Sequence, residues 1–280
     1  VSGVRVTKLH GSLYSHERSY LPHAMFPQVD IRVASWVERI GVRHADLVVA
    51  PSRAMARDGC QRLGVRETVR ILPNSVDLDY IDKHLRGAHT GGDSSGPIRV
   101  MFSGRVDRMK GAHVLDAIVN ALRDDPYSGE WEFFLAGSCT DVGAYPSLSS
   151  TDSRNVAVHF LGPLALPKLL VLLREAQVFL FPSHAENCPM SLLEAMACRI
   201  PVVSSSVGGI PEMVADGEEG FLCGRADIGG FVSALMWLRD AGRRKEMGER
   251  ARARVEKDFD SVRLAGRWVD MCVEVRYQGH

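Results

Sequence analysis

The sequence of 280 residues is long enough for two domains that each bury a core. Its hydrophobic content of 45% and charged content of 24% are those of an ordinary globular protein. The 34 basic and 34 acidic residues cancel, which argues against broad electrostatic binding of nucleic acid or of an anionic membrane. No apolar run approaches the roughly 20 residues of a membrane-spanning helix, and no signal peptide is visible.

The six cysteines form no C-x-x-C pair and have apolar neighbours. Reduced thiols in a cytoplasmic protein are expected for such a set. The cysteines are Cys60, Cys139, Cys188, Cys198, Cys223 and Cys272. No histidine or other base has a spacing that singles it out as a partner of Cys188, so this residue is interpreted as a small loop residue and not as a nucleophile.

In residues 1–88, short apolar runs alternate with helical patterns. The patterns predict strands over 4–9, 47–50 and 69–72 and helices over 29–40, from the N-cap Ser52 to Gly64, and over 80–89. These elements form a parallel α/β layer. Three strands are fewer than the about six of a complete dinucleotide-type domain. At roughly 30 residues per βαβ unit, on the order of 90 residues would be missing before Val1. The chain is therefore expected to be a fragment or a naturally shortened protein, and its activity on its own is left open.

Residues 89–97, HTGGDSSGP, are rich in glycine and serine, which is typical of a flexible connection between domains. The second domain, 98–280, then alternates regularly. Strands are predicted over 98–102, 132–136, 156–161, 178–181 and 201–204, and helices over 112–122, 167–176, 190–197 and 228–240, followed by an amphipathic helical tail. This pattern predicts an α/β fold with a doubly wound parallel sheet.

Two carboxylates bracket the junction between the strand 178–181 and the helix that begins near Met190. Glu186 lies in the loop and Glu194 in the second helical turn, in the arrangement E-x7-E. The amino terminus of a helix has unpaired N–H groups and about half a positive charge, so it suits an anion such as a diphosphate. The carboxylates would accept hydrogen bonds from hydroxyl groups on either side of that anion. The alternative is that both are ordinary solvated charges.

A second strand-to-helix junction lies upstream, in the pattern G-R-x4-K-G. Gly104 allows a sharp turn after the strand 98–102, while Arg105 and Lys110 bring two cations beyond the strand end. Open α/β sheets bind their ligands at this edge. Isolated basic residues are otherwise most often solvent-exposed.

The D-x-D pattern of Asp77 and Asp79 matches a known metal-binding motif. It follows Pro73 and Asn74, and an acidic turn is the favoured interpretation. We predict that no divalent metal ion and no other cofactor is required.

Several motifs in this order resemble those of the retaining GT-B glycosyltransferases of the family-4 type. The resembling segments are DLVVAPS at 46–52, LPNSVD at 72–77, SGRVDRMKG at 103–111, FLG at 160–162, FPS at 181–183, the stretch from Glu186 to Glu194, and GGIPE at 208–212. The resemblance runs from about residue 10 to the last helices. It implies two Rossmann-like domains, the first incomplete, with the last helix crossing back onto the first domain.

The resemblance also implies roles for individual residues. Glu186 would hold sugar hydroxyls, Glu194 the ribose hydroxyls, and His10 the donor sugar from the first domain. The catalytic set is His10, Arg105, Lys110 and Glu186. The donor-binding set is Gly104, Arg105, Lys110, Leu161, Glu186, Met190, Ser191, Leu192 and Glu194. Pro189 stands where the family commonly has a glycine, so that amides of Met190 and Ser191 would contact the diphosphate.

The implied function is transfer of a hexosyl group from a nucleotide-sugar donor to a carbohydrate or glycolipid acceptor, with retention of anomeric configuration. Polysaccharide or glycoconjugate synthesis in the cytoplasm or at the inner face of the membrane would be the setting, with peripheral membrane association and without nucleic-acid partners. The alternative is a non-catalytic nucleotide-sugar-binding or docking module, since the family's glycine-rich loop is not found. A third interpretation is a GT-B epimerase or phosphorylase.

Overall fold

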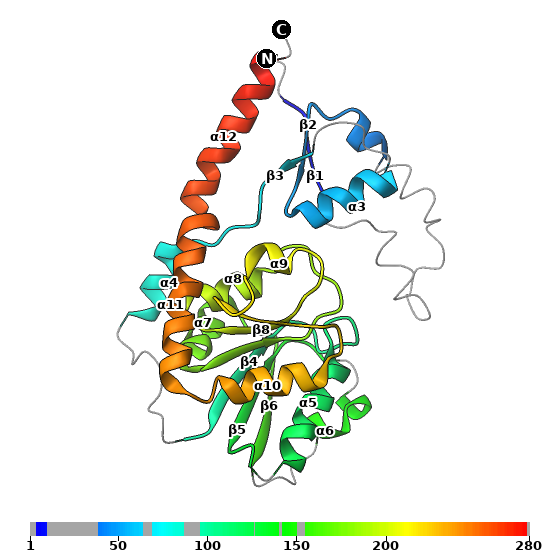
Figure 1. Cartoon of the computed structure of the whole chain (residues 1–280). Helices are drawn as coiled ribbons and strands as arrows, with labels where there is room; N and C mark the ends of the chain where they lie inside the picture. The colour runs from blue at the N-terminus through cyan, green and yellow to red at the C-terminus, as the bar shows by residue number, and fades with distance from the viewer. Residues whose placement is uncertain are drawn as a thin grey trace. The chain divides into compact units, whose positions relative to one another are not determined.

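The computed structural model describes residues 4–9, 39–63, 69–86, 96–125, 127–139, 142–149 and 155–278. The chain forms two compact units. One consists of residues 1–74 with 262–280, and the other of residues 75–261. Each unit contains its own parallel β-sheet (Figure 1).

The described part of the first unit has a three-stranded sheet in the order β1-β2-β3. The strands are β1 (Val6–Lys8), β2 (Leu47–Ala50) and β3 (Arg70–Ile71). Helix α3 (Arg53–Leu63) follows β2, and the Ser52 Oγ accepts a hydrogen bond from the Met55 amide at 3.1 Å. The predicted N-cap is thus confirmed. Most of the helix predicted over 29–40 lies outside the described residues. The described residues 39–43 are helical.

Helix α12 (Ser261–Gln278) supplies part of the core of the first unit. Leu264 is buried with Leu47 and Val49 of β2, and further apolar side chains of the helix pack around this cluster. On β3, the Ile71 carbonyl oxygen accepts a hydrogen bond from the Arg267 guanidinium at 3.2 Å. One apolar stripe of the helix is therefore covered by this sheet.

The second unit has a six-stranded sheet in the order β6-β5-β4-β7-β8-β9, in which all neighbouring strands are parallel. The strands are β4 (Ile98–Ser103), β5 (Trp131–Ala136), β6 (Val156–Gly162), β7 (Val178–Phe181), β8 (Val202–Ser205) and β9 (Gly220–Cys223). The helices are α4 (Leu78–Leu85), α5 (Ala112–Asp124), η1 (Val142–Ala144), α6 (Pro146–Ser149), α7 (Leu166–Glu175), α8 (Met190–Ala197), α9 (Ile210–Met213), α10 (Ile228–Trp237) and α11 (Ala241–Asp258). Helices lie on both faces of the sheet (Figure 1). This arrangement is the predicted doubly wound sheet.

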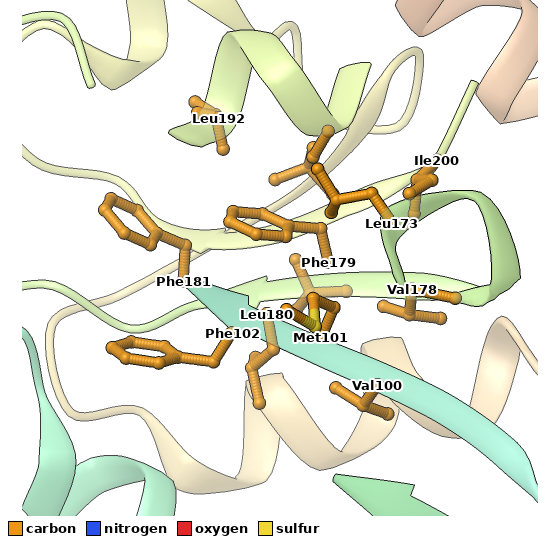
Figure 2. Packing of buried hydrophobic residues seen from close by; sticks show 14 of the residues in the cluster. Val100, Met101, Phe102, Leu173, Val178, Phe179, Leu180, Phe181, Leu192 and Ile200 are labelled. Atoms are coloured by element: carbon orange, nitrogen blue, oxygen red, sulfur yellow. The ribbon is translucent and has the colours of Figure 1, made fainter. Parts of the chain in front are cut away.

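The central strands β4 and β7 carry several of the largest fully buried side chains of the core. Phe102 and Phe181 lie side by side with ring centroids 6.3 Å apart, and both side chains are at most 1% exposed (Figure 2). All four residues of β7 are buried. A strand that is buried on both faces has a continuous run of apolar residues. This run is why β7 could be predicted correctly from the sequence.

Helix α4 packs within the second unit, although the sequence-based boundary assigned residues up to 88 to the first domain. Ile81 is buried in the large core cluster. The carboxylate of Asp82 accepts two hydrogen bonds from Arg252 of α11, at 2.7 and 2.8 Å. The compact unit accordingly begins at Ser75.

Several elements were not predicted from the sequence. They are η1, α6, α9, β9 and α11. The helix predicted over 228–240 ends as α10 at Trp237, and Asp240 caps α11 by accepting a hydrogen bond from the Arg243 amide at 2.8 Å. An aspartate before a helix is a signal for a helix start. The signal at Asp240 was missed because the neighbouring residues also fit a continuing helix.

Candidate functional site

The chain changes direction across the sheet between β4 and β7. From β4 it continues outward to β5 and β6, and from β7 it continues the other way to β8 and β9. The loops that follow β4 and β7 therefore leave the same sheet edge as neighbours. This is the topological switch point at which open parallel sheets bind ligands.

The loops after β4 and β7 are held against each other at Met109. The Met109 carbonyl oxygen accepts hydrogen bonds from the His184 amide at 2.8 Å and from the Ser183 hydroxyl at 3.2 Å. Gly111 adopts φ +79°, and a Cβ atom built there would lie 2.0 Å from the Pro182 carbonyl oxygen. Only glycine permits this close approach.

Lys110 and Glu186 meet where these two loops converge. The Lys110 Nζ forms an ion pair with Glu186 Oε1, and the Ser183 hydroxyl donates to the same oxygen at 2.7 Å. The side chains of Glu186 and Lys110 are 9% and 25% exposed. The sequence-predicted cation and carboxylate are thus brought together across 76 positions of the chain.

The loop after β8 also touches the backbone of Glu186. The Gly209 amide donates to the Glu186 carbonyl oxygen at 3.0 Å. A Cβ atom on Gly208, which has φ +54°, would lie 1.8 Å from the same oxygen. Three loops therefore fix the position of Glu186. Both glycines belong to the motif GGIPE that was identified in the sequence. Their contact with Glu186 was not predicted, because it has no local sequence signal.

Arg105 lies in the same loop as Lys110, on its solvent side. Its side chain is 60% exposed, and its Nε lies 3.0 Å from Asp107 Oδ2. Asp107 Oδ1 accepts a hydrogen bond from the Lys110 amide at 2.9 Å. Asp107 therefore shapes the turn that carries both cations. It was not among the site residues predicted from the sequence. An aspartate that bonds to a backbone amide three residues later is the sequence signal for such a turn.

Gly104 and Leu161 extend the site edge on the other side of β4. Gly104 has φ +154°, and its amide donates to the Ala136 carbonyl oxygen at 2.9 Å. Gly137 approaches it so closely that a Cβ atom there would lie 1.8 Å from the Gly104 carbonyl oxygen. Leu161 is half-buried near the end of β6, two strands away from β4.

Helix α8 presents its amino terminus at this edge without a side-chain cap. Pro189 occupies the N-cap position, and Met190 is the first helical residue. Met190 is exposed and Ser191 half-buried, whereas the Leu192 side chain is fully buried. Any contact of Leu192 with a ligand would therefore involve its backbone amide. The first amides of a helix have no intrahelical acceptor, so they favour an anion.

Glu194 lies one turn further along α8 and is half-buried. Burial raises the pKa of its carboxyl group. Within the described ranges, no donor forms a hydrogen bond or an ion pair with this carboxylate. A buried carboxylate without a partner is costly, which is a common property of binding-site residues. His10, the remaining predicted catalytic residue, lies outside the described residues.

The D-x-D pattern has a structural role in α4. The Asp77 side chain caps the helix by accepting a hydrogen bond from the Tyr80 amide at 2.9 Å. Over the described parts of the chain, no three histidine, cysteine, aspartate or glutamate side chains gather closely enough to hold a metal ion.

All six cysteines are free thiols in the structure. Cys188 is buried in the loop before α8. Burial, together with nearby carboxylates, raises the pKa of Cys198 and Cys223 to about 12. A thiol that stays protonated at neutral pH is a poor nucleophile.

None of the helices described in the structure has the length and apolar character needed to cross a membrane.

Two family descriptions match the chain. Residues 97–240, slightly more than half of the sequence, match glycosyl transferases group 1. Residues 5–80 match glycosyltransferase family 4.

Two enzymes are among the most similar relatives. N-acetyl-alpha-D-glucosaminyl L-malate synthase of Bacillus anthracis is 36% identical over 243 residues, covering 85% of this chain and 62% of that protein. Alpha-maltose-1-phosphate synthase of Mycolicibacterium smegmatis is 31% identical over 257 residues, covering 84% of this chain and 64% of that protein. The chain thus spans about three fifths of the length of these relatives.

Solved structures of other proteins share the fold. Sucrose-phosphate synthase from Thermosynechococcus elongatus superposes with a TM-score of 0.74 at 22% identity, covering 98% of this chain and 68% of that one. Anabaena HepE in complex with UDP-glucose gives a TM-score of 0.73 at 22% identity, covering 96% and 72%. The predicted fold is confirmed: the chain has the GT-B architecture and belongs to the glycosyl transferases group 1.

Proposed function

We propose that this chain transfers a hexosyl group from a nucleotide-sugar donor to a hydroxyl group of a carbohydrate or glycolipid acceptor, with retention of anomeric configuration. One observation carries the proposal. Lys110 and Glu186 meet at the switch point of the second sheet, where α8 begins without a side-chain cap, and Glu194 lies one turn further along the same helix. Cations and helix amides suit a diphosphate, and carboxylates suit the hydroxyl groups on either side of it.

In the reaction, the bond between the anomeric carbon and the diphosphate oxygen breaks, and a bond to the acceptor oxygen forms. The departing diphosphate gains negative charge, which Arg105, Lys110 and the amides of Met190 and Ser191 would stabilise. The diphosphate oxygen would take the acceptor proton, so no separate nucleophile is needed. Glu186 would orient the sugar, and Glu194 would bind the ribose hydroxyls.

Lys110 and Glu186 have a specific geometry for this role. Lys110 and Ser183 both engage Oε1 of Glu186, which leaves Oε2 to accept hydrogen bonds from a sugar. Lys110 also lies 5.5 Å from the centroid of the Phe181 ring. Contacts from several groups limit the movement of both side chains, and such preorganisation is what a donor site requires.

The donor class is supported by HepE, whose structure contains UDP-glucose. We place the reaction in polysaccharide or glycoconjugate synthesis without a metal cofactor. The six free thiols fit a reducing compartment, so we assign it to the cytoplasm, with the inner face of the membrane as the site of a glycolipid acceptor.

The proposal is tested by incubating the chain with UDP-glucose, UDP-N-acetylglucosamine, GDP-mannose or ADP-glucose and a panel of sugar and lipid-linked acceptors. Proton NMR of the anomeric signals follows the reaction. We expect an α-linked product from an α-linked donor, unchanged by EDTA and lost in Lys110→Ala. A β-linked product would contradict retention. Donor binding without turnover by any acceptor would instead support the binding-module function.

A further inference from the structure

A histidine pair links the loop that carries Glu186 to helix α5. His184 lies two residues before Glu186, and His113 lies in the first turn of α5. Their Nε2 atoms are 3.0 Å apart, the ring planes differ by 11°, and the ring centroids are 4.8 Å apart. The ring planes are thus nearly parallel, and the two Nε2 atoms share an N–H···N hydrogen bond whose donor depends on the tautomers.

We propose that His113 and His184 act as positioning residues for the donor site, and that protonation of this pair at acidic pH releases the Glu186 loop and weakens donor binding. The inference rests on the proposed function, because it concerns the same site. It adds a pH response that the donor-binding residues alone do not provide.

The surroundings of the pair determine which nitrogen carries the proton. His113 Nδ1 is buried and has no hydrogen-bond partner among the residues that the structure describes. A buried N–H without an acceptor costs more than a buried lone pair without a donor. The favoured arrangement is therefore a His113 ring protonated on Nε2, which donates to the unprotonated Nε2 of His184.

Adding a proton to this arrangement is unfavourable at either ring. A proton on His113 Nδ1 would create a buried donor without an acceptor. A proton on His184 Nε2 would place two N–H groups 3.0 Å from each other. Both outcomes destabilise the contact between the loop and α5.

The charges that surround the pair also oppose protonation. Burial lowers the pKa of both histidines, and Arg108, from the loop after β4, lowers both further. Arg225, from the loop after β9, and His113 itself act in the same direction on His184. The nearby acidic side chains Glu186 and Asp107 are already paired with Lys110 and Arg105.

The direction of the pH effect follows from these shifts. The folded-state pKa of each histidine lies below the ordinary value of 6.5. Between the two values the unfolded chain binds more protons than the folded chain, so stability is present above the ordinary pKa and is lost as the pH falls. Protonation also removes the hydrogen bond between His184 of the loop and His113 of α5.

The loop has other links whose charge does not change near neutral pH. The His184 amide and the Ser183 hydroxyl both donate to the Met109 carbonyl oxygen. Protonation of the pair should therefore loosen the loop without unfolding it. The expected result is a graded loss of donor affinity and not a loss of structure.

The experiment is calorimetric titration of the full chain with UDP-glucose at about pH 7.5 and about pH 5.5. This probe is a diphosphate diester, so its own charge is constant between the two conditions. We expect the wild-type affinity to fall by about three- to tenfold on acidification, the size of one hydrogen bond. His113→Phe and His184→Phe should bind more weakly at the higher pH and show no further loss at the lower one.

His159→Gln is the matched control, since His159 lies on the edge strand β6, stacks on Phe134 and is not a member of the pair. It should keep the wild-type pH response. An equal loss of affinity in the wild type and in both phenylalanine variants would overturn the inference.

A second measurement separates this inference from the proposed function. Nitrogen-15 NMR of the imidazole rings follows the pair in the absence of any nucleotide. We expect both rings to stay neutral at about pH 6.5 and the pKa of each to rise when the other is replaced by phenylalanine. Independent titration of the two rings at their ordinary pKa would overturn the inference. Absence of UDP-glucose binding at both pH values, with coupled titration intact, would overturn the donor site alone.

Discussion

Glu194 shows how the cost of burial in the ligand-free protein can point to a candidate binding residue. Its side chain is half-buried in α8, and burial raises the pKa of its carboxyl group. No described neighbour compensates that burial with a hydrogen bond. A group of this kind is retained when a ligand supplies the missing partner.

We predict that Glu194→Gln stabilises the ligand-free protein and weakens nucleotide binding. The folded-state pKa lies above the ordinary value of 4.5, so the folded protein holds the proton more tightly than the unfolded chain. The free energy of unfolding of the wild type therefore falls as the pH rises from the ordinary pKa through the folded-state pKa of Glu194. Glu194→Gln does not titrate there, so its free energy of unfolding should not fall in this way. Urea unfolding at several pH values measures it.

Glu130→Gln, in the exposed turn before β5, serves as the control and should change neither the pH profile nor nucleotide affinity. A Glu194→Gln variant that is less stable than the wild type at neutral pH would contradict this account, because it would show that the carboxylate has a stabilising partner.

Substitutions at Gly111 and Gly217 distinguish the cost of backbone strain from the cost of a steric clash. Their φ angles are +79° and +80°, but a Cβ atom at Gly217 would meet nothing within 4 Å, whereas at Gly111 it would meet the Pro182 carbonyl. We expect Gly217→Ala to lower the free energy of unfolding by about 1 kcal/mol through strain alone. Gly111→Ala should lower it by about 3 kcal/mol or more and should also reduce donor affinity.

Chemical denaturation of both glycine variants tests this difference. Equal destabilisation would mean that the loops after β4 and β7 move apart at little cost, and that their close approach does not hold Lys110 and Glu186 together.

At the scale of elements, Arg252 joins α11 to α4 and α8. Its side chain is 6% exposed, and it donates to Asp82, to Glu256 and to the Ala197 carbonyl oxygen. Arg250, two residues earlier, pairs with Glu246 and Glu218 at the surface. The two arginines have the same charge and lie on the same helix but differ in burial.

We predict that Arg252→Met lowers the free energy of unfolding by about 2 kcal/mol, since several charge-assisted hydrogen bonds are lost. Arg250→Met should cost about 0.5 kcal/mol or less, because exposed ion pairs contribute little. Thermal unfolding compares the two variants. A similar cost for both would show that α4 is not anchored through Arg252.

The elements also show what local sequence patterns can specify. The apolar run of β7 and the Ser52 cap of α3 were predicted because burial on both faces and capping leave local signals. Strand β9 was missed because it begins with a glycine, a residue that is unfavourable in strands. That glycine lies so close to the Val202 carbonyl of β8 that a Cβ atom would be 2.2 Å from it, a requirement that only the paired strand reveals.

At the scale of the whole molecule, the site depends on strand order, which no local pattern encodes. Lys110 and Glu186 belong to loops that become neighbours because β4 and β7 pair in the sheet. The sequence placed both residues in one site through their resemblance to a family. Ser183, Gly208 and the histidine pair were not assigned roles, since their contacts arise only from the assembled loops.

The division of the chain follows packing more closely than composition. The glycine- and serine-rich stretch 89–97 marked a boundary in the sequence, yet the second unit already begins at Ser75. The Val76 amide donates to the Phe259 carbonyl and the Ser261 amide to the Val76 carbonyl, both at 3.0 Å. These bonds between distant segments decide where the unit starts.

We propose that the second unit holds a nucleotide-sugar donor at its switch point. Calorimetric titration of the chain with UDP, GDP and ADP tests it most directly, repeated with Glu194→Ala, with Lys110→Ala and with Lys168→Ala on exposed α7 as the control. We predict that one nucleotide binds selectively, that the first two variants lose about tenfold or more in affinity, and that the control binds as the wild type does. No binding of any nucleotide to the folded chain, or binding that survives both substitutions, would contradict the claim.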